Sequence, residues 1–209
     1  MGDRPVFELD HKTPLQAANL PVINQLAKEG QCGTADPVKP GIVASTVSGT
    51  LAILGYDPLE KTVARGVVEA LGCGMKINIG DVAFRGNWAT LDEKGLIVDR
   101  RAGRIREGIN ELALSITGQK IDNVRIDVAA GTEHRIAVVI RGPGLQDCVS
   151  GSDPGDHFHS GIIPRPIKPL NKNNQKCLRT ADLLNLFELK AREILAKHPV
   201  NLKRVSNNL

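Results

Sequence analysis

Aromatic residues are scarce in this chain. Phe, Trp and Tyr together make up 3% of its 209 residues, with a single Trp and a single Tyr. Proteins that bind single-stranded nucleic acid stack successive bases on successive aromatic rings, and this composition excludes such a platform. No apolar run approaches the roughly 18 residues of a membrane-spanning helix, and the N-terminal MGDRPVFELD lacks the apolar core of a signal peptide. We therefore expect a cytoplasmic protein without nucleic-acid or membrane partners.

Cysteines at metal-binding spacing are also absent. Cys32, Cys73, Cys148 and Cys177 are far apart, and none belongs to a C-x-x-C pair or stands at zinc-ligand spacing from a histidine. This pattern excludes a zinc-finger type of site. The simplest interpretation is that the cysteines are reduced thiols.

Glycine and proline, by contrast, are plentiful, with 21 and 12 residues. They predict many short elements joined by turns. Helices are expected from the Thr13-Pro14 start signal through residue 28, at the end of 41–55, over 105–116 and over 180–197, and strands over 31–35, 82–91, 95–99, 124–130 and 135–140. The strand-strand-helix-strand-strand order after residue 82 is typical of an α+β unit with an antiparallel sheet. Residues 142–176, rich in Gly, Pro, Asn and Asp, predict a long irregular connection.

Positive charge is concentrated in one segment. The chain carries a net charge of +4, too little for a general polyanion-binding protein, whereas residues 85–106 hold six basic and three acidic side chains. Five of these six are arginines, whose planar guanidinium groups suit bidentate capture of phosphate or carboxylate. Arg85 and Asn87 share a face of their predicted strand because side chains two residues apart point the same way. An anion site and a set of surface ion pairs both remain open on this evidence.

Hydroxyl groups gather where the loop after residue 41 enters a helix. Ser45, Thr46 and Ser48 stand at that helix start, where free backbone N–H groups favour an anion. A hydroxyl here is a nucleophile if a metal or base activates it, but the commoner role is a plain helix cap, which we favour on sequence chemistry alone. The later run Asp153 to His159 offers two histidines and two aspartates, for which we favour a hydrophilic loop over a metal site.

Several longer motifs match those of a known family. They are TPLQAANLPVINQLAKEG, ILGYDP, RGVVEALG, GDVAFRGNWAT, IVDRRAGRI, GTEHR and TADLLNLFELKAREILAKHPVN. Through them the chain resembles the archaeal-type, 2,3-bisphosphoglycerate-independent (cofactor-independent) phosphoglycerate mutases of the alkaline phosphatase superfamily. The resemblance extends from residue 2 to about residue 201, and GDVAFRGNWAT with DRRAGRI is its most specific pair of motifs.

The resemblance implies an isomerase that interconverts 3-phosphoglycerate and 2-phosphoglycerate in glycolysis and gluconeogenesis. Two divalent metal ions, Mn²⁺ or Mg²⁺, and a transiently phosphorylated hydroxyl group would serve this reaction, without 2,3-bisphosphoglycerate. Thr46 is implied as the nucleophile, with Ser45 or Ser48 as alternatives, and Asp3 and Thr46 as metal ligands. Asp99 would act as an acid, a base or a group that orients a hydroxyl. The side chains expected to hold the phosphate and carboxylate are Arg65, Arg85, Asn87, Arg100, Arg101, Arg104, His134 and Arg135.

The resemblance also implies an α/β fold with a partial alkaline-phosphatase-like core and an inserted α+β domain with an antiparallel sheet. Residues 1–60 would form part of the metal-binding catalytic core, 61–178 the inserted substrate-binding domain, and 179–209 a helix that returns to the core. We expect a fragment that lacks both termini of the family and that, alone, binds phosphoglycerate without turnover. The alternatives are a related homoserine-kinase-like phosphotransferase and a catalytically inactive phosphoglycerate-binding fragment.

Overall fold

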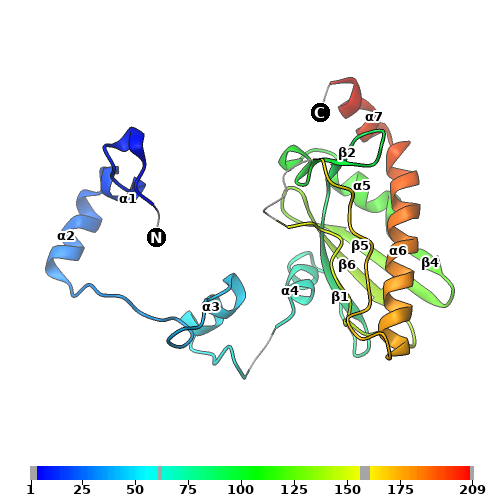
Figure 1. The fold of residues 1–209 in the computed structure, drawn as a ribbon, viewed down its shortest axis with the longest axis horizontal. Coiled ribbons are helices and arrows are strands. Elements are labelled where there is room, and N and C mark those ends of the chain that lie inside the picture. Colours follow the sequence, from blue (N-terminus) through cyan, green and yellow to red (C-terminus); the bar gives the residue numbers. More distant parts are fainter. Residues whose placement is uncertain (1–3, 61–62, 156–160, 208–209) are drawn as a thin grey trace. The chain divides into compact units, whose positions relative to one another are not determined.

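The computed structural model describes residues 4–60, 63–155 and 161–207 (Figure 1). The backbone divides into two compact units, Met1–Lys61 and Thr62–Leu209, which we call the N-terminal unit and the sheet unit. The sheet unit takes in both 62–178 and the C-terminal helices. The predicted three-part division by function stays a prediction, while the structure groups its second and third parts in one compact unit.

The N-terminal unit contains short helices joined by irregular backbone. They are η1 (Phe7–Leu9), α1 (Pro14–Ala17), α2 (Pro21–Glu29) and α3 (Thr46–Ile53). The start signal at Thr13 is confirmed, because its hydroxyl accepts a hydrogen bond from the Gln16 N–H at 3.2 Å and Pro14 is the first helical residue. The strand predicted over 31–35 is wrong, since no described residue pairs with this segment. None of residues 4–60 is buried.

An antiparallel sheet forms the centre of the sheet unit. Its strands are β1 (Val82–Asn87), β4 (Gln119–Ile121), β5 (Val124–Ala130) and β6 (Arg135–Arg141), in the order β1-β6-β5-β4. The predicted hairpin of β5 and β6 is confirmed, and the antiparallel sheet within a mixed α/β fold agrees with the expected fold class. The other predicted hairpin is only partly right. β1 pairs with β6, and only β2 (Thr90–Leu91) pairs with β3 (Ile97–Asp99).

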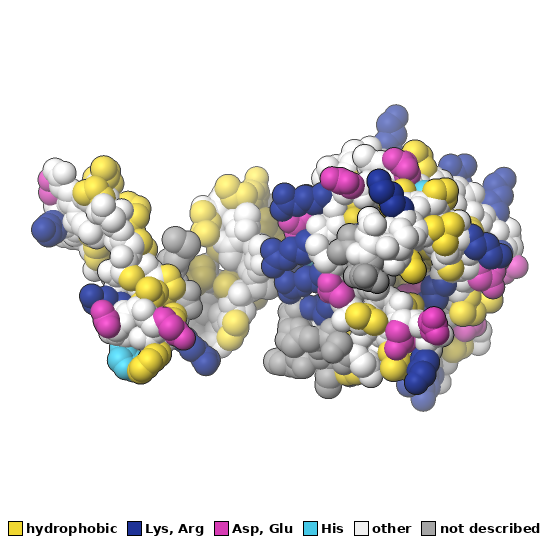
Figure 2. Space-filling view, turned by 90° about the horizontal axis from the view of Figure 1, so that it is seen from above, with side chains coloured by type: hydrophobic (Ala, Val, Ile, Leu, Met, Phe, Trp, Pro, Cys, Tyr) yellow, Lys and Arg dark blue, Asp and Glu magenta, His cyan; other side chains and the backbone are white. Residues whose placement is uncertain are grey.

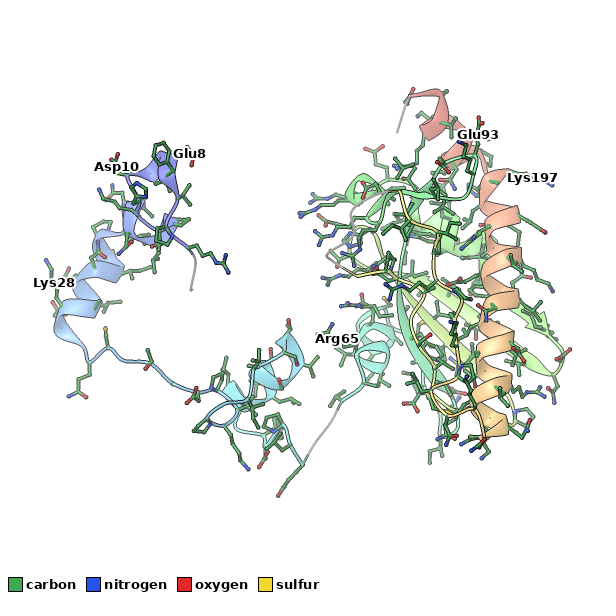
Figure 3. All side chains as sticks on the ribbon, viewed as in Figure 1. Glu8, Asp10, Lys28, Arg65, Glu93 and Lys197 are labelled. Carbon is green, nitrogen blue, oxygen red and sulfur yellow. A yellow bond between two sulfur atoms is a disulfide. The ribbon has the colours of Figure 1, made fainter. Side chains whose placement is uncertain are left out.

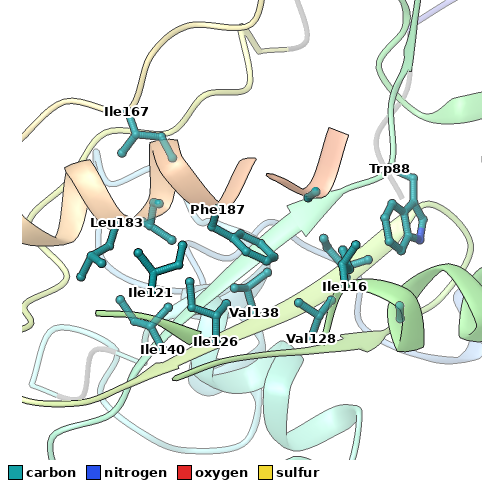
Figure 4. Close-up of a cluster of buried hydrophobic side chains, with 14 of the residues drawn as sticks. Trp88, Ile116, Ile121, Ile126, Val128, Val138, Ile140, Ile167, Leu183 and Phe187 are labelled. Carbon is teal, nitrogen blue, oxygen red and sulfur yellow. The ribbon is translucent and has the colours of Figure 1, made fainter. Parts of the chain in front are cut away.

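Helices cover both faces of the sheet. α5 (Ile109–Ile116) and α6 (Gln175–Ala196) pack on the face that carries Ile126, Val138 and Ile140. Side chains of the two helices and of this face together form the main core (Figure 4). Each large apolar side chain buried there contributes roughly 1.5 to 3 kcal/mol. α4 (Arg65–Gly72) packs on the opposite face, against Ala137 and Val139. The alternation of β6 side chains between the two clusters follows from the two-residue period of a strand.

Two helices begin elsewhere than the sequence pattern predicts. α5 starts at Ile109 instead of residue 105, because Gly108 has a left-handed backbone with φ of 73°. α6 starts at Gln175, where the Asn174 side chain caps it by accepting from the Lys176 N–H at 2.9 Å. Thr180, predicted as the cap, is instead fully buried, and its hydroxyl accepts from the Gln146 N–H at 3.0 Å. A further helix, α7 (Pro199–Ser206), was not predicted, because His198-Pro199 reads equally as a stop signal and as a new start.

The connection from residue 142 to α6 holds no helix or strand within 142–155 and 161–174, as predicted. It is fixed by a disulfide between Cys148 and Cys177, whose Cα atoms are 5.3 Å apart. The expectation of reduced cysteines is therefore wrong for this pair, while Cys32 and Cys73 are free thiols. Spacing along the sequence gives no sign of a pair 29 residues apart. Among the described helices, none combines the length and the apolar character needed to cross a membrane.

Candidate anion-binding site

A cleft of about 280 Å³ in the sheet unit is lined by polar side chains. Its volume lies just below the usual range for small-molecule sites, about 300 to 1,000 Å³. Figure 2 shows Lys and Arg side chains gathered on one side of the larger body. The lining side chains are Arg85, Asn87, Arg100, Arg101, Arg104, Glu133, His134 and Arg135. They come from three places in the sequence that the fold brings together: β1, the segment after β3, and the turn that leads into β6.

The sheet supplies one wall of the cleft. Arg85 and Asn87 alternate with core-facing residues on β1, and Asn87 lies directly opposite Arg135 on β6. These side chains therefore share the face of the sheet on which α4 packs. Gly86, between them, faces the other way, and a Cβ atom there would lie 2.9 Å from the Ile136 side chain. Close packing behind the strand thus fixes the direction in which Arg85 and Asn87 point.

A left-handed turn after β3 supplies the second wall. Ala102, Gly103 and Arg104 have φ of 45°, 63° and 53°, a conformation that non-glycine residues adopt only at a cost in energy. The Asp99 carboxylate accepts hydrogen bonds from the backbone N–H groups of Arg101 at 2.8 Å and of Gly103 at 2.6 Å. Burial raises the pKa of Asp99, but these two hydrogen bonds, together with the charges of His134 and Arg101, lower it overall. The ionised carboxylate thus holds the turn that presents the arginines.

The turn between β5 and β6 supplies Glu133 and His134. Glu133 has a left-handed backbone with φ of 56°, and its carboxylate binds the Arg106 guanidinium at 2.5 Å, which lowers the pKa of Glu133. The pKa of His134 is lowered by burial first and by the nearby Arg101 and Arg135 next. His134 is therefore neutral near pH 7, with one ring nitrogen as donor and the other as acceptor.

Asp153, from the irregular connection, binds two of the lining side chains. Its carboxylate accepts from Arg100 twice, from Nε at 3.2 Å and from Nη2 at 2.7 Å, and from the Asn87 amide at 3.2 Å. Burial raises the pKa of Asp153, but its hydrogen bonds with Arg100, Gly155 and Asn87, together with the charge of Arg100, lower it overall. Asp153 is thus ionised at neutral pH and holds the β1 wall and the segment after β3 together.

Five arginines therefore line a cleft whose acidic lining residue, Glu133, is already bound to Arg106. Guanidinium groups stay charged at any physiological pH and match the oxygens of phosphate and carboxylate in pairs. Together with a neutral imidazole and an amide, they suit a small ligand with more than one anionic group.

Comparison with known proteins defines the family. Residues 27–201 match the family model described as 2,3-bisphosphoglycerate-independent phosphoglycerate mutase. This chain belongs to that family. It is 43% identical to the protein of that name from Methanobrevibacter smithii and 46% identical to the one from Picrophilus torridus, over its full length and 50% of theirs. A solved cofactor-independent phosphoglycerate mutase from Thermoplasma acidophilum covers all of the chain with a TM-score of 0.65 and 42% identity, over 53% of its own length. The chain thus spans about half the length of the curated relatives that it matches.

The resemblance stated from the motifs is therefore confirmed as a family membership, and the fold places most of the predicted binding residues together. Seven of the eight side chains expected to hold substrate in this mutase family line the cleft. The exception, Arg65, is the first residue of α4 and is not among the lining residues (Figure 3). Asp99 does not line the cleft either, because its carboxylate is directed to backbone N–H groups. The role of each residue stays a prediction.

The hydroxyl residues of the expected nucleophile region lie in the N-terminal unit. Ser45 caps α3, its hydroxyl accepting from the Ser48 N–H at 3.1 Å, while the Ser48 hydroxyl accepts from the Ser45 N–H at 2.8 Å. This reciprocal cap confirms the structural role favoured for the region at these two residues. Thr46, the first residue of α3, takes no part in the cap. Its role as nucleophile and metal ligand stays a prediction.

Metal ligands are the least complete part of the expected site. The predicted ligand Asp3 lies outside the described residues, as do Asp156, His157 and His159. Within 4–60, 63–155 and 161–207, no three His, Cys, Asp or Glu side chains lie close enough together to hold a metal ion. The described part of the chain therefore does not fit a two-metal centre by itself. The relatives' name, which specifies independence of 2,3-bisphosphoglycerate, agrees with the expectation that this cofactor is not used.

The sequence analysis gave no binding role to two residues of the site. Glu133 lines the cleft, and its nearest signal was its place in the GTEHR motif beside His134. Asp153 was assigned to a hydrophilic loop, because the arginine that it binds lies 53 residues away in the sequence. Only the folded chain brings an irregular segment and a strand end together, so no local pattern identifies such a pair.

Proposed function

We propose that this chain supplies the substrate-binding part of a 2,3-bisphosphoglycerate-independent phosphoglycerate mutase, with phosphoglycerate as the ligand of the arginine cleft. The observation that carries the proposal is the convergence of five arginines, Asn87 and a neutral His134 on one small cleft. Phosphoglycerate carries a phosphate and a carboxylate on a three-carbon chain, so it needs several cationic forks at fixed positions. Membership in the mutase family supports this choice of ligand.

The whole reaction, including its place in glycolysis and gluconeogenesis in the cytoplasm, is part of the proposal. In it, Thr46 accepts the phosphoryl group and returns it to the neighbouring hydroxyl of glycerate, which converts 3-phosphoglycerate to 2-phosphoglycerate. The arginines hold the ligand and balance its negative charge throughout. Two divalent metal ions would lower the charge on the transferring phosphoryl group, and Asp3 and Thr46 are our candidate ligands in this chain.

A calorimetric titration of the chain with 3-phosphoglycerate tests the ligand. We expect saturable binding, and a loss of about 10- to 100-fold in affinity for Arg101→Ala, because a hydrogen bond to a charged group contributes about 1.5 to 3 kcal/mol. Arg125→Ala is the matched control, since Arg125 is an exposed arginine of the same sheet that pairs with Asp127 and is not a lining residue. Binding that is unaffected by Arg101→Ala, or no binding at all, contradicts the proposal.

A further inference from the structure

Asp153 lies outside the lining set, and its carboxylate binds the side chains of two lining residues, Arg100 and Asn87. Arg100 is its main partner, and the Arg100 side chain is only 13% exposed, against 41% for Asp153. The pair joins the side-on edge of the guanidinium, Nε and Nη2, to both carboxylate oxygens. Such a two-point contact fixes the rotation of the guanidinium plane, which a single hydrogen bond does not.

The segment that carries Asp153 is itself anchored at several points. The disulfide joins Cys148 to Cys177 in the first turn of α6, and the Ser152 hydroxyl donates to the Glu188 carboxylate of the same helix at 2.5 Å. The Ser150 N–H donates to the Lys168 carbonyl at 2.8 Å. Asp153 also accepts from the Gly155 N–H at 2.9 Å, which fixes its own side chain. The carboxylate is therefore presented to the cleft from a rigid support, α6, that belongs to the main core.

Arg100 needs such support because of its neighbours. Four other arginines line the same cleft, and like charges gathered around one small cleft repel one another. Without a counter-charge, a long arginine side chain gains both rotamer freedom and electrostatic relief by turning away from the cleft. Asp153 offsets both tendencies, and it orients the Asn87 amide through the same carboxylate.

We propose that Asp153 is a positioning residue of the arginine cleft, which holds Arg100 and Asn87 in the orientation that receives the anionic ligand. This inference rests on the proposed function for the identity of the ligand. The positioning role has a consequence that separates it from simple repulsion of the ligand. A carboxylate that merely repelled an incoming anion would weaken binding, and its removal would then strengthen binding, whereas a positioning carboxylate has the opposite effect.

Titrations with 3-phosphoglycerate separate the two roles. Asp153→Ala is expected to weaken binding about tenfold, because two side chains must then be ordered by the ligand itself. Asp153→Asn keeps one oxygen acceptor of the same shape, so we expect it to recover part of the loss. Asp147→Ala, an exposed aspartate of the same connection, is the control and is expected to bind as the unaltered chain does. Equal or tighter binding by Asp153→Ala overturns the proposal.

A spectroscopic measurement adds a readout that a general loss of structure does not reproduce. The Nε–H resonance of Arg100, assigned by its loss in Arg100→Lys, is expected to exchange slowly with water in the unaltered chain and in Asp147→Ala, and rapidly in Asp153→Ala. The fluorescence of the buried Trp88 serves as the check that the sheet unit is folded in each variant. If the unaltered chain binds no phosphoglycerate, the proposed function fails, and the Arg100 resonance alone decides whether Asp153 fixes this side chain. Slow exchange that persists in Asp153→Ala overturns that fixation.

Discussion

Reduction of the Cys148–Cys177 disulfide is expected to lower the free energy of unfolding of the sheet unit by about 3 to 4 kcal/mol. The bond joins residues 29 apart in the sequence. For a loop of that length, the entropy that cross-linking removes from the unfolded chain corresponds to roughly 3.6 kcal/mol at 25 °C. Cys177 is fully buried at the start of α6 and Cys148 is half-buried, so a reductant reaches the bond from the side of Cys148.

Urea unfolding followed by tryptophan fluorescence measures this loss. Trp88 is the only tryptophan of the chain and is 7% exposed in the main core, so its emission reports on the sheet unit alone. With a urea dependence of roughly 2 kcal/mol per molar, the midpoint is expected to fall by about 1.5 to 2 M when dithiothreitol is added. The double variant Cys148→Ser, Cys177→Ser is expected to unfold at the midpoint of the reduced chain and to ignore the reductant.

Two results would refute this reasoning. One is a midpoint that does not move on reduction, which would mean that the bond does not restrict the unfolded chain. The other is a count of four thiols in the unfolded, unreduced chain. Titration is expected to find two, those of Cys32 and Cys73, and a count of four would show that the bond does not form.

Three further predictions concern packing and charge. Gly66→Ala places a Cβ atom 2.0 Å from the Ala83 carbonyl oxygen and is expected to cost about 1 to 3 kcal/mol in urea unfolding, whereas Gly72→Ala, with no atom within 4 Å of its Cβ, is expected to leave stability unchanged or slightly raised. The lowered pKa of Asp99 stabilises the fold above its unfolded pKa of about 3.9, so the stability advantage over Asp99→Asn is expected at pH 7 and lost as pH falls through the folded pKa. The ring resonances of His134 are expected to titrate below pH 6.5, and at higher pH once phosphoglycerate is bound, because an adjacent anion favours the charged imidazole.

Each of these has a clear contrary outcome. Equal destabilisation by the two glycine variants would mean that the contact of α4 with β1 is not tight. A stability difference that does not shrink as the pH falls from 7 to well below about 3.9 would mean that the Asp99 carboxylate does not hold the turn after β3. A pKa of His134 that is unmoved by the ligand would place the bound anion away from this side chain.

The sheet was predictable from the sequence where local pattern and tertiary pairing agree. β5 begins with alternating apolar and polar residues, β6 is an apolar run between two arginines, and a short turn joins them, so their hairpin is a local structure and was identified correctly. β1 has an equally clear pattern, yet its partner is β6, about 50 residues further along the chain, and not the next strand. Periodicity shows which face of a strand is buried but carries no information about the neighbour that it pairs with.

The candidate site was predictable to the extent that residue type reveals chemistry. Clustered arginines in a strand and the following turn indicated an anion site, and the fold brings them together around one cleft. The sequence could not show what each carboxylate does. Asp99, expected as an acid, a base or a hydroxyl-orienting group, binds backbone N–H groups, and Asp153, assigned to a loop, binds an arginine of the cleft. Both outcomes depend on backbone conformation, which for Asp99 is a left-handed turn that side-chain chemistry does not predict.

The arginine cleft is costly for folding, and the nature of that cost supports a binding role. Ala102 and Arg104 hold left-handed backbone conformations, and five guanidinium groups of like charge lie around about 280 Å³. Ala102 itself packs in the main core, but the gathering of five like charges does nothing to improve that core. Strain and like charge persist in a fold only where the surrounding structure enforces them, here through Asp99 below the turn and Asp153 beside Arg100. Because both carboxylates stabilise the arrangement of the arginines without filling the cleft, the remaining electrostatic repulsion is relieved when an anion binds, and that relief contributes to affinity for a ligand with several negative charges.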